Sequence, residues 1–139
     1  QAAIGLAQLN RINEFYTSRK KIFDYYNKKF KNFKFIKLLP KNKWSKNSLW
    51  LYTIIIKDLK RDKRDILIKK LLAKGIETRP GFVSFSQMEI YKKFCKGSFS
   101  VSKQISNSSL SLPSTSINFK DQDYITSQLL LEISKIYKV

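Results

Sequence analysis

The chain has 139 residues, 28 basic and 10 acidic side chains, and a formal net charge of +18. Its length suits one domain. A hydrophobic share of 42% and an aromatic share of 14% exclude a disordered tail, and four glycines with three prolines exclude a collagen-like or linker sequence. The chain contains no histidine and one cysteine, Cys95. This composition excludes an internal disulfide, the usual zinc sites and histidine-dependent nucleophiles within the chain, so no metal site is expected.

The apolar runs are too short to span a bilayer, and the chain does not open with a charged segment followed by an apolar one. Together with the single cysteine, to which we assign no role, this indicates a soluble protein in a reducing cytoplasm, with no membrane partner.

The positive charge has two explanations. Basic surfaces bind nucleic acid. However, lysines outnumber arginines by 23 to 5, isoleucines outnumber valines by 16 to 3, and the lysines are dispersed. Both biases are typical of A/T-rich genes, and nucleic-acid surfaces rely more on arginine. We therefore favour a solvated lysine-rich surface, and a module that binds nucleic acid or another polyanion is the alternative.

The first half of the chain predicts one helix and two strands. Apolar residues at steps of three and four predict a helix over most of residues 2–30. It begins without a capping residue, so we expect the natural chain to continue upstream. Phe33–Leu39 and Leu49–Lys57 are predicted strands, joined by the polar loop Lys41–Asn47. Within the second strand, Ile54–Ile56 predicts burial on both faces.

The next predicted helix starts at Asp62 as N-cap, runs to about Lys74 and ends before Gly75, a residue typical of the position after a helix. Its expected apolar face consists of Ile66, Leu67, Leu71 and Leu72. The later predicted elements are a strand at Ile76–Arg79 ended by Pro80, short helices near Gln87–Phe94 and Ser100–Asn107, a strand at Leu110–Leu112, and a last helix capped by Asn118 that extends to about Ile136. This order predicts an α+β fold in which helices cover a small, mainly antiparallel sheet.

The segment Gly75–Phe82 has the best-placed charged group. Arg79 ends a predicted strand and precedes a rigid proline and a loop, where an arginine can meet an anionic group. The alternative is a solvated arginine, or one paired with Glu77. Trp44 and Trp50 could be stacking platforms or could belong to a core or interface.

Several segments, taken in order, carry a family resemblance. They are the opening QAAIGLAQL of Gln1–Leu9, the aromatic Ser48–Tyr52, the helix pattern of Asp62–Gly75, GIETRPGF of Gly75–Phe82, Met88 and Tyr91, LSLPS of Leu110–Ser114, and the closing Asn118–Ile136. In these segments the chain resembles the C-terminal part of the DegT/StrS-type sugar aminotransferases, especially the perosamine-synthase-like branch. These pyridoxal-phosphate enzymes aminate keto groups of nucleotide-linked sugars.

The resemblance implies the small C-terminal domain of a fold-type I aminotransferase. Residues 1–30 would be the helix between domains, and residues 31–139 the small domain. The large domain, which would bind pyridoxal 5'-phosphate and hold the Schiff-base lysine, would lie upstream, so no catalytic residue and no cofactor-binding residue is expected in this chain. The implied partners are a nucleotide-linked keto-sugar, an amino-acid amino donor such as glutamate and a second copy in a homodimer. Amino-sugar or lipopolysaccharide biosynthesis is the implied setting.

By motif position, the resemblance implies that Arg79 steers or pairs with a substrate anion and that Phe82 walls the sugar site. Trp50 is a third expected substrate contact. Ser86 stands where the family often has a histidine, and it is the fourth expected substrate contact. Gly81 stands where the related stretch has a phenylalanine. The serine at position 86 leaves a non-catalytic family relative as a further alternative.

Overall fold

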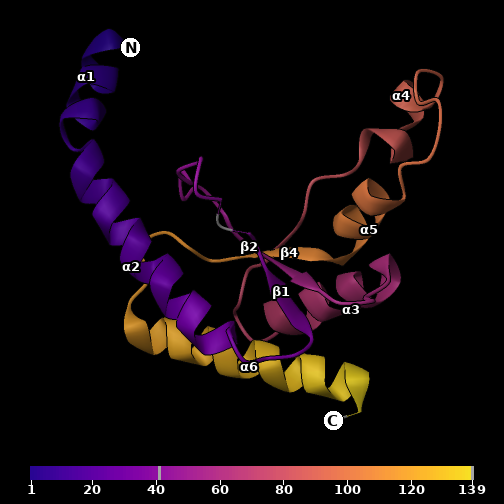
Figure 1. The fold of residues 1–139 in the computed structure, drawn as a ribbon. Coiled ribbons are helices and arrows are strands. Elements are labelled where there is room, and N and C mark those ends of the chain that lie inside the picture. The colour runs from indigo at the N-terminus through magenta and orange to yellow at the C-terminus, as the bar shows by residue number, and fades with distance from the viewer. Residues whose placement is uncertain (41, 139) are drawn as a thin grey trace.

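The structure is a computed structural model and describes residues 1–40 and 42–138 (Figure 1). Its elements, in chain order, are α1 (Ala2–Asn10), α2 (Ile12–Phe30), β1 (Ile36–Leu38), β2 (Tyr52–Ile56), α3 (Arg61–Leu72), β3 (Arg79–Pro80), the 3₁₀ helix η1 (Phe85–Gln87), α4 (Glu89–Lys92), α5 (Ser100–Ser108), β4 (Ser109–Leu112) and α6 (Phe119–Tyr137). The predicted α+β class is confirmed. Within the described ranges, no helix combines the length and the apolar character needed to cross a bilayer.

The sheet has four antiparallel strands in the order β1-β2-β4-β3. Ile54 of β2 faces Leu110 of β4, and both side chains are fully buried. Because β3 lies at an edge, it can include Pro80, which has no N–H group to donate to a neighbouring strand. The fold therefore places the segment after Arg79 at the border of the sheet.

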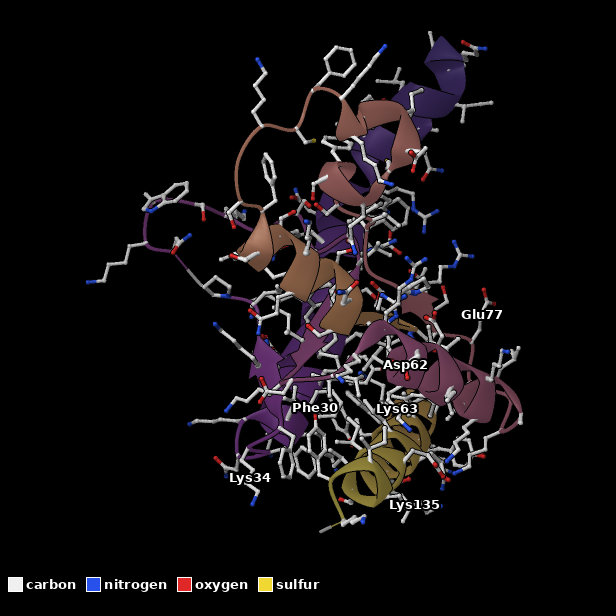
Figure 2. The ribbon with its side chains drawn as sticks, turned by 90° about the vertical axis from the view of Figure 1, so that its right-hand side faces the viewer. Phe30, Lys34, Asp62, Lys63, Glu77 and Lys135 are labelled. Carbon is white, nitrogen blue, oxygen red and sulfur yellow. The ribbon has the colours of Figure 1, made fainter. Side chains whose placement is uncertain are left out.

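Helices α2, α3 and α6 supply the rest of the core. Figure 1 shows α6 running beneath the sheet and α2 descending beside the sheet until its C-terminal end crosses α6. Tyr26 and Phe30 of α2 are almost fully buried, and the hydroxyl of Tyr26 donates to the carbonyl oxygen of Pro113 at 2.8 Å. Figure 2 shows Phe30 inside the molecule, whereas Lys34 lies at its rim. The apolar helix faces thus define one covered face of the sheet.

A buried carboxylate joins α3 to α6. Glu132 of α6 is only 4% exposed, and its carboxylate lies 2.8 Å from the ammonium groups of Lys74 and Lys135 and 3.4 Å from that of Lys70. Hydrogen bonds from Lys135 and then Lys74 lower the pKa of Glu132 to about 2. Glu132 therefore stays ionised and holds the two helices together.

The long N-terminal helix differs from its prediction. It is divided at Arg11, whose φ of −105° and ψ of 6° interrupt the helix between α1 and α2. None of the residues of α1 is buried, whereas α2 contributes four side chains to the core. The break comes before the part of the helix that packs on the sheet, so tertiary contacts support α2 but not α1.

Both strands of the first pair are shorter than predicted. The first covers Ile36–Leu38 and the second covers Tyr52–Ile56. Leu49 cannot continue the second strand, because its φ is +57°. The prediction that Ile54–Ile56 is buried on both faces is wrong, because Ile55 is partly exposed on the face opposite Ile54. In the predicted loop, Asn42–Asn47 is non-regular, while Lys41 lies outside the described residues.

Two predictions for α3 are wrong. The helix begins at Arg61 with Lys60 as N-cap and no side-chain cap, so Asp62 lies within the first turn instead. The buried positions are Arg64, Leu67 and Leu71, while Ile66 is 47% and Leu72 59% exposed. The sheet and α6 select a narrower helix face than the hydrophobic pattern alone suggests. Gly75 has the predicted left-handed φ, +75°, just after the helix.

The elements after α3 lie mostly where the sequence predicts them. The predicted strand Ile76–Arg79 is wrong at both ends: β3 covers only Arg79 and Pro80, because only these residues are aligned with β4, and Pro80 belongs to the strand instead of ending it. The expected helix near Gln87–Phe94 is divided into η1 and α4. By contrast, α5 and β4 lie where predicted, and the side chain of Asn118 caps α6 by accepting from the N–H of Asp121 at 2.9 Å.

Candidate functional site

Arg79 presents an accessible positive charge at the sheet edge. Its guanidinium is 76% exposed and lies 3.3 Å from the carboxylate of Glu77, which is 72% exposed. Figure 2 shows Glu77 at the outer edge of the molecule. Ion pairs with this exposure contribute little stability and exchange readily with solvent. The structure thus combines both interpretations of Arg79: it has an internal partner and remains reachable by an external anion.

The side chains of Trp50 and Phe82 lie beside each other although the two residues are far apart in the sequence. Their ring centroids lie 6.1 Å apart with an interplanar angle of 32°, and the residues are 63% and 76% exposed. Arg19 of α2 fixes the segment before β2 by donating to the carbonyl oxygens of Leu49 at 3.1 Å and Trp50 at 2.7 Å. Two large apolar rings exposed side by side are typical of a contact surface.

Gly81 allows the segment after β3 to lie directly against Ser109 of β4. Its N–H donates to the carbonyl oxygen of Ser109 at 3.1 Å. A Cβ atom at position 81 would lie 1.8 Å from the Oγ and 2.8 Å from the Cβ of Ser109. Only glycine permits this approach. Gly81, which stands where the related stretch has a phenylalanine, therefore leaves the space that the side chain of Ser109 occupies. The sequence pattern provided no signal for this pairing.

Ser86 lies in a cluster of hydroxyl groups. Its Oγ is 2.9 Å from the Oγ of Ser84, which also accepts from the hydroxyl of Ser102 at 2.7 Å. The N–H of Ser84 donates to the Oγ of Ser106 at 3.2 Å. These bonds attach the segment after Phe82 to α5. The fold thus brings Trp50 and Phe82 together and places Ser86 within this separate cluster.

Buried Arg64 is a feature of this region that the sequence did not predict. Its side chain is 5% exposed, donates to the carbonyl oxygen of Ser106 at 2.6 Å, and contacts one carboxylate oxygen of Asp65 through two donors at 2.8 and 3.0 Å. Arg64 therefore connects α3 to the part of α5 that holds Ser84. Because the charge of Arg64 is buried only through long-range packing, no local pattern distinguishes it from the neighbouring basic residues.

The described part of the chain also contains a groove. This groove of about 400 Å³ lies between α2 and the segment before β2, and Tyr16, Lys20, Asn27, Lys46 and Thr53 are among its lining residues. Lys20 is paired with Asp24 at 2.5 Å, and the ammonium of Lys46 lies 4.6 Å from the ring centroid of Tyr16. The local cations are thus already engaged within the groove.

Within residues 1–40 and 42–138, no lysine side chain is fully buried. A lysine that holds this cofactor must be enclosed beside the groups that bind its ring and phosphate. Among the described residues, every lysine is exposed except half-buried Lys74, whose ammonium contacts Glu132 and the amide oxygen of Gln128 at 2.8 Å each. Lys74 is therefore already committed to the contact between α3 and α6, and no reaction step is assigned to this chain's lysines.

The sequence profile of the DegT/DnrJ/EryC1/StrS aminotransferase family matches residues 1–130. The chain belongs to this family. The resemblance stated from the ordered motifs is therefore confirmed. GDP-perosamine synthase of Caulobacter vibrioides is 31% identical over 114 residues, which cover 81% of this chain and 31% of that enzyme.

Solved structures of two larger enzymes share the fold. Helicobacter pylori PseC, an aminotransferase involved in the biosynthesis of pseudoaminic acid, superposes with a TM-score of 0.84 at 20% identity, over 96% of this chain and 36% of PseC. E. coli GDP-4-keto-6-deoxy-D-mannose-3-dehydratase with bound hydrated PLP gives 0.76 at 23% identity, over 91% and 34%. The chain thus spans about a third of the length of these relatives, and the structural likeness shows the fold alone.

Proposed function

We propose that this chain is the small C-terminal domain of a pyridoxal-phosphate-dependent sugar aminotransferase. Such an enzyme transfers an amino group from an amino acid, usually glutamate, to a keto group of a nucleotide-linked sugar. The family match supports the enzyme class, and the exposed Trp50–Phe82 pair is the observation that favours a sugar-contacting role for this part. Residues 1–30 would lead into the domain, and residues 31–139 would form it.

Within this domain the side chains bind and orient substrate. The Trp50–Phe82 pair packs against the apolar face of a sugar ring and excludes water from one side of it. Arg79 attracts an anionic group of the substrate, and Arg64 with the serine cluster holds the segment that carries Phe82. When bound to the large domain, pyridoxal phosphate supplies the electron sink for the transfer.

The exposed apolar residues of α1 support a longer enzyme. Ile4, Leu6 and Leu9 are 60% to 70% exposed, and α1 extends away from the sheet in Figure 1. We propose that the large domain covers them, that the complete enzyme is a homodimer, and that it acts in the cytoplasm in amino-sugar synthesis for a surface polysaccharide such as lipopolysaccharide. An apolar surface of this kind is typical of an interface.

The test uses the longer protein that carries this chain as its C-terminal part. Incubated with pyridoxal phosphate, glutamate and a nucleotide-linked 4-keto-sugar, it should bind the cofactor and release 2-oxoglutarate. Replacing Phe82 with alanine should raise KM roughly 5- to 10-fold with a smaller effect on kcat, since about 1 kcal/mol of ring contact is lost. Phe94→Ala is the matched control, because Phe94 is also exposed, at 71%.

Three outcomes would contradict the proposal in different ways. Cofactor binding without turnover would favour the non-catalytic relative. Tight binding of nucleic acid that weakens steeply with salt would favour the polyanion-binding module. Normal turnover with an unchanged KM in Phe82→Ala would retain the enzyme but remove the sugar-contacting role of the aromatic pair.

A further inference from the structure

A small groove between α3 and α6 combines apolar and basic side chains. We call it the α3–α6 groove; its volume is about 240 Å³, and its lining residues are Lys63, Ile66, Leu67, Lys70, Lys135 and Ile136. The four residues from α3 are spaced by three and four positions, so they share one face of that helix. Among the described residues that line the groove, none is an expected substrate contact. The groove is therefore separate from the site of the proposed enzyme function.

The apolar part of the groove is a helix surface that the fold leaves uncovered. Ile66 follows the apolar spacing of α3 but is 47% exposed, and Ile136 of α6 is partly exposed. Leu67 is fully buried, so it lies at the base of the groove. Pockets for small molecules usually enclose about 300–1,000 Å³. The α3–α6 groove is smaller and fits one or two apolar side chains of a partner.

Three lysines surround this apolar surface. The ammonium groups of Lys70 and Lys135 lie 3.4 and 2.8 Å from the buried carboxylate of Glu132, which fixes their positions. Each ammonium carries three N–H donors, so both can still donate to an external oxygen. Within residues 1–40 and 42–138, Lys63 forms no ion pair. Figure 2 labels Lys63 on α3 and Lys135 on α6 at the lower side of the molecule.

Charge and size together select the kind of partner. A second copy of this chain carries the same charge of +18, so this groove would repel it. Single-stranded nucleic acid and membrane surfaces favour aromatic side chains beside the cations, and none of the described lining residues is aromatic. An acidic peptide fits better, because its carboxylates can pair with the lysines while a neighbouring apolar side chain covers Ile66.

We propose that the α3–α6 groove docks an acidic segment of another protein, in which carboxylates flank an apolar side chain. The apolar side chain packs on Ile66 and Leu67, and the carboxylates pair with Lys63, Lys70 and Lys135. Docking goes beyond the proposed function and does not depend on it, because binding at this groove requires neither sugar nor cofactor.

The experiment titrates the 139-residue chain into a fluorescein-labelled peptide in which glutamates flank a central leucine, and follows fluorescence anisotropy. All titrations are made at physiological ionic strength, because a chain of charge +18 attracts every anion and salt screens distant charges. Two control peptides each change one property: one has serine in place of leucine, and the other has glutamine in place of glutamate. The leucine peptide should bind saturably, and each control should bind at least about 3-fold more weakly.

Substitutions in the chain then test the groove itself. Lys63→Gln should weaken binding of the leucine peptide about 2- to 5-fold, while Lys63→Arg keeps the charge and should bind normally. Ile66→Ser should weaken the leucine peptide about 2- to 5-fold but change little for the serine peptide, a difference that misfolding cannot imitate. Lys93→Gln is the matched control, because Lys93 is also exposed and follows α4, which Figure 1 shows far from α6.

Several results would overturn the proposal. One is the absence of saturable binding by the leucine peptide; another is an equal loss in Lys93→Gln and Lys63→Gln, which would indicate general attraction to the positive surface. Equal affinity for the leucine and serine peptides would remove the apolar contact. Tighter Lys63-dependent binding of a thymidine oligonucleotide or of phosphatidylserine vesicles would assign the groove to nucleic acid or a membrane. Failed turnover in the longer protein would leave these results intact, so the two proposals fail separately.

Discussion

The close approach of Gly81 to Ser109 makes a quantitative prediction about stability. In Gly81→Ala, the new Cβ would lie 1.8 Å from the Oγ and 2.8 Å from the Cβ of Ser109. The hydroxyl can rotate away, but a separation of 2.8 Å between two Cβ atoms requires the backbones to move apart. Overpacking of this kind costs about 1–3 kcal/mol, and weakening the bond from the Gly81 N–H to Ser109 adds about 0.5–1.5 kcal/mol. We expect a total loss of roughly 2–4 kcal/mol.

Equilibrium unfolding in urea, followed by circular dichroism, measures this loss. Ser109→Gly removes both clashing atoms, so the double variant should regain at least half of the lost free energy of unfolding in a double-mutant cycle. Gly5→Ala is the matched control: a Cβ atom at position 5 would meet no other element within 4 Å, and alanine favours the helix there. The reasoning is refuted if Gly81→Ala is as stable as the parent chain, or if Ser109→Gly restores nothing.

Three further outcomes are expected. Because the pKa of Glu132 is lowered from 4.5 to about 2 in the folded chain, its contribution to stability is present above pH 4.5 and is lost as the pH falls toward 2. This pH dependence, on the order of 3 kcal/mol, should disappear in Glu132→Gln, and its persistence would assign it to other carboxylates. Asn118→Ala should lose about 1 kcal/mol in urea unfolding while Asn118→Asp loses less, and equal losses would exclude the capping role. Arg64→Gln should speed amide hydrogen exchange at Ser84 more than at Leu129, because it releases the end of α5 that holds the loop; uniform acceleration would instead indicate general destabilisation.

Local residue chemistry was enough to predict where several helices begin or end. Asn118 was identified as a cap because its side chain can accept a backbone N–H three residues later, and this bond forms. Gly75 was identified as the residue after a helix because it alone tolerates a positive φ without strain. The order of helices and strands followed from such signals and from the spacing of apolar residues.

Which side chains on a helix face are buried could be established only from the tertiary structure. Ile66 and Leu72 fit the apolar spacing of α3 but remain exposed, whereas Arg64 is buried because α5 provides a carbonyl acceptor. The exposed faces of α1 and the interruption at Arg11 likewise depend on which surfaces find a neighbour. Periodicity identifies a helix face, but it does not measure how much of that face another element covers.

The sequence by itself determined the family, the α+β order and the identity of Arg79, Trp50 and Phe82 as expected contacts, because motifs and local backbone preferences are written in neighbouring residues. Only the tertiary structure decided that Trp50 lies beside Phe82, that Gly81 lies against Ser109, and that Ser111 of β4 is paired with Thr53 of β2 on one side and Arg79 of β3 on the other. These relations arise from strand order and register. Both depend on packing between segments distant in the chain, which one-dimensional spacing does not encode.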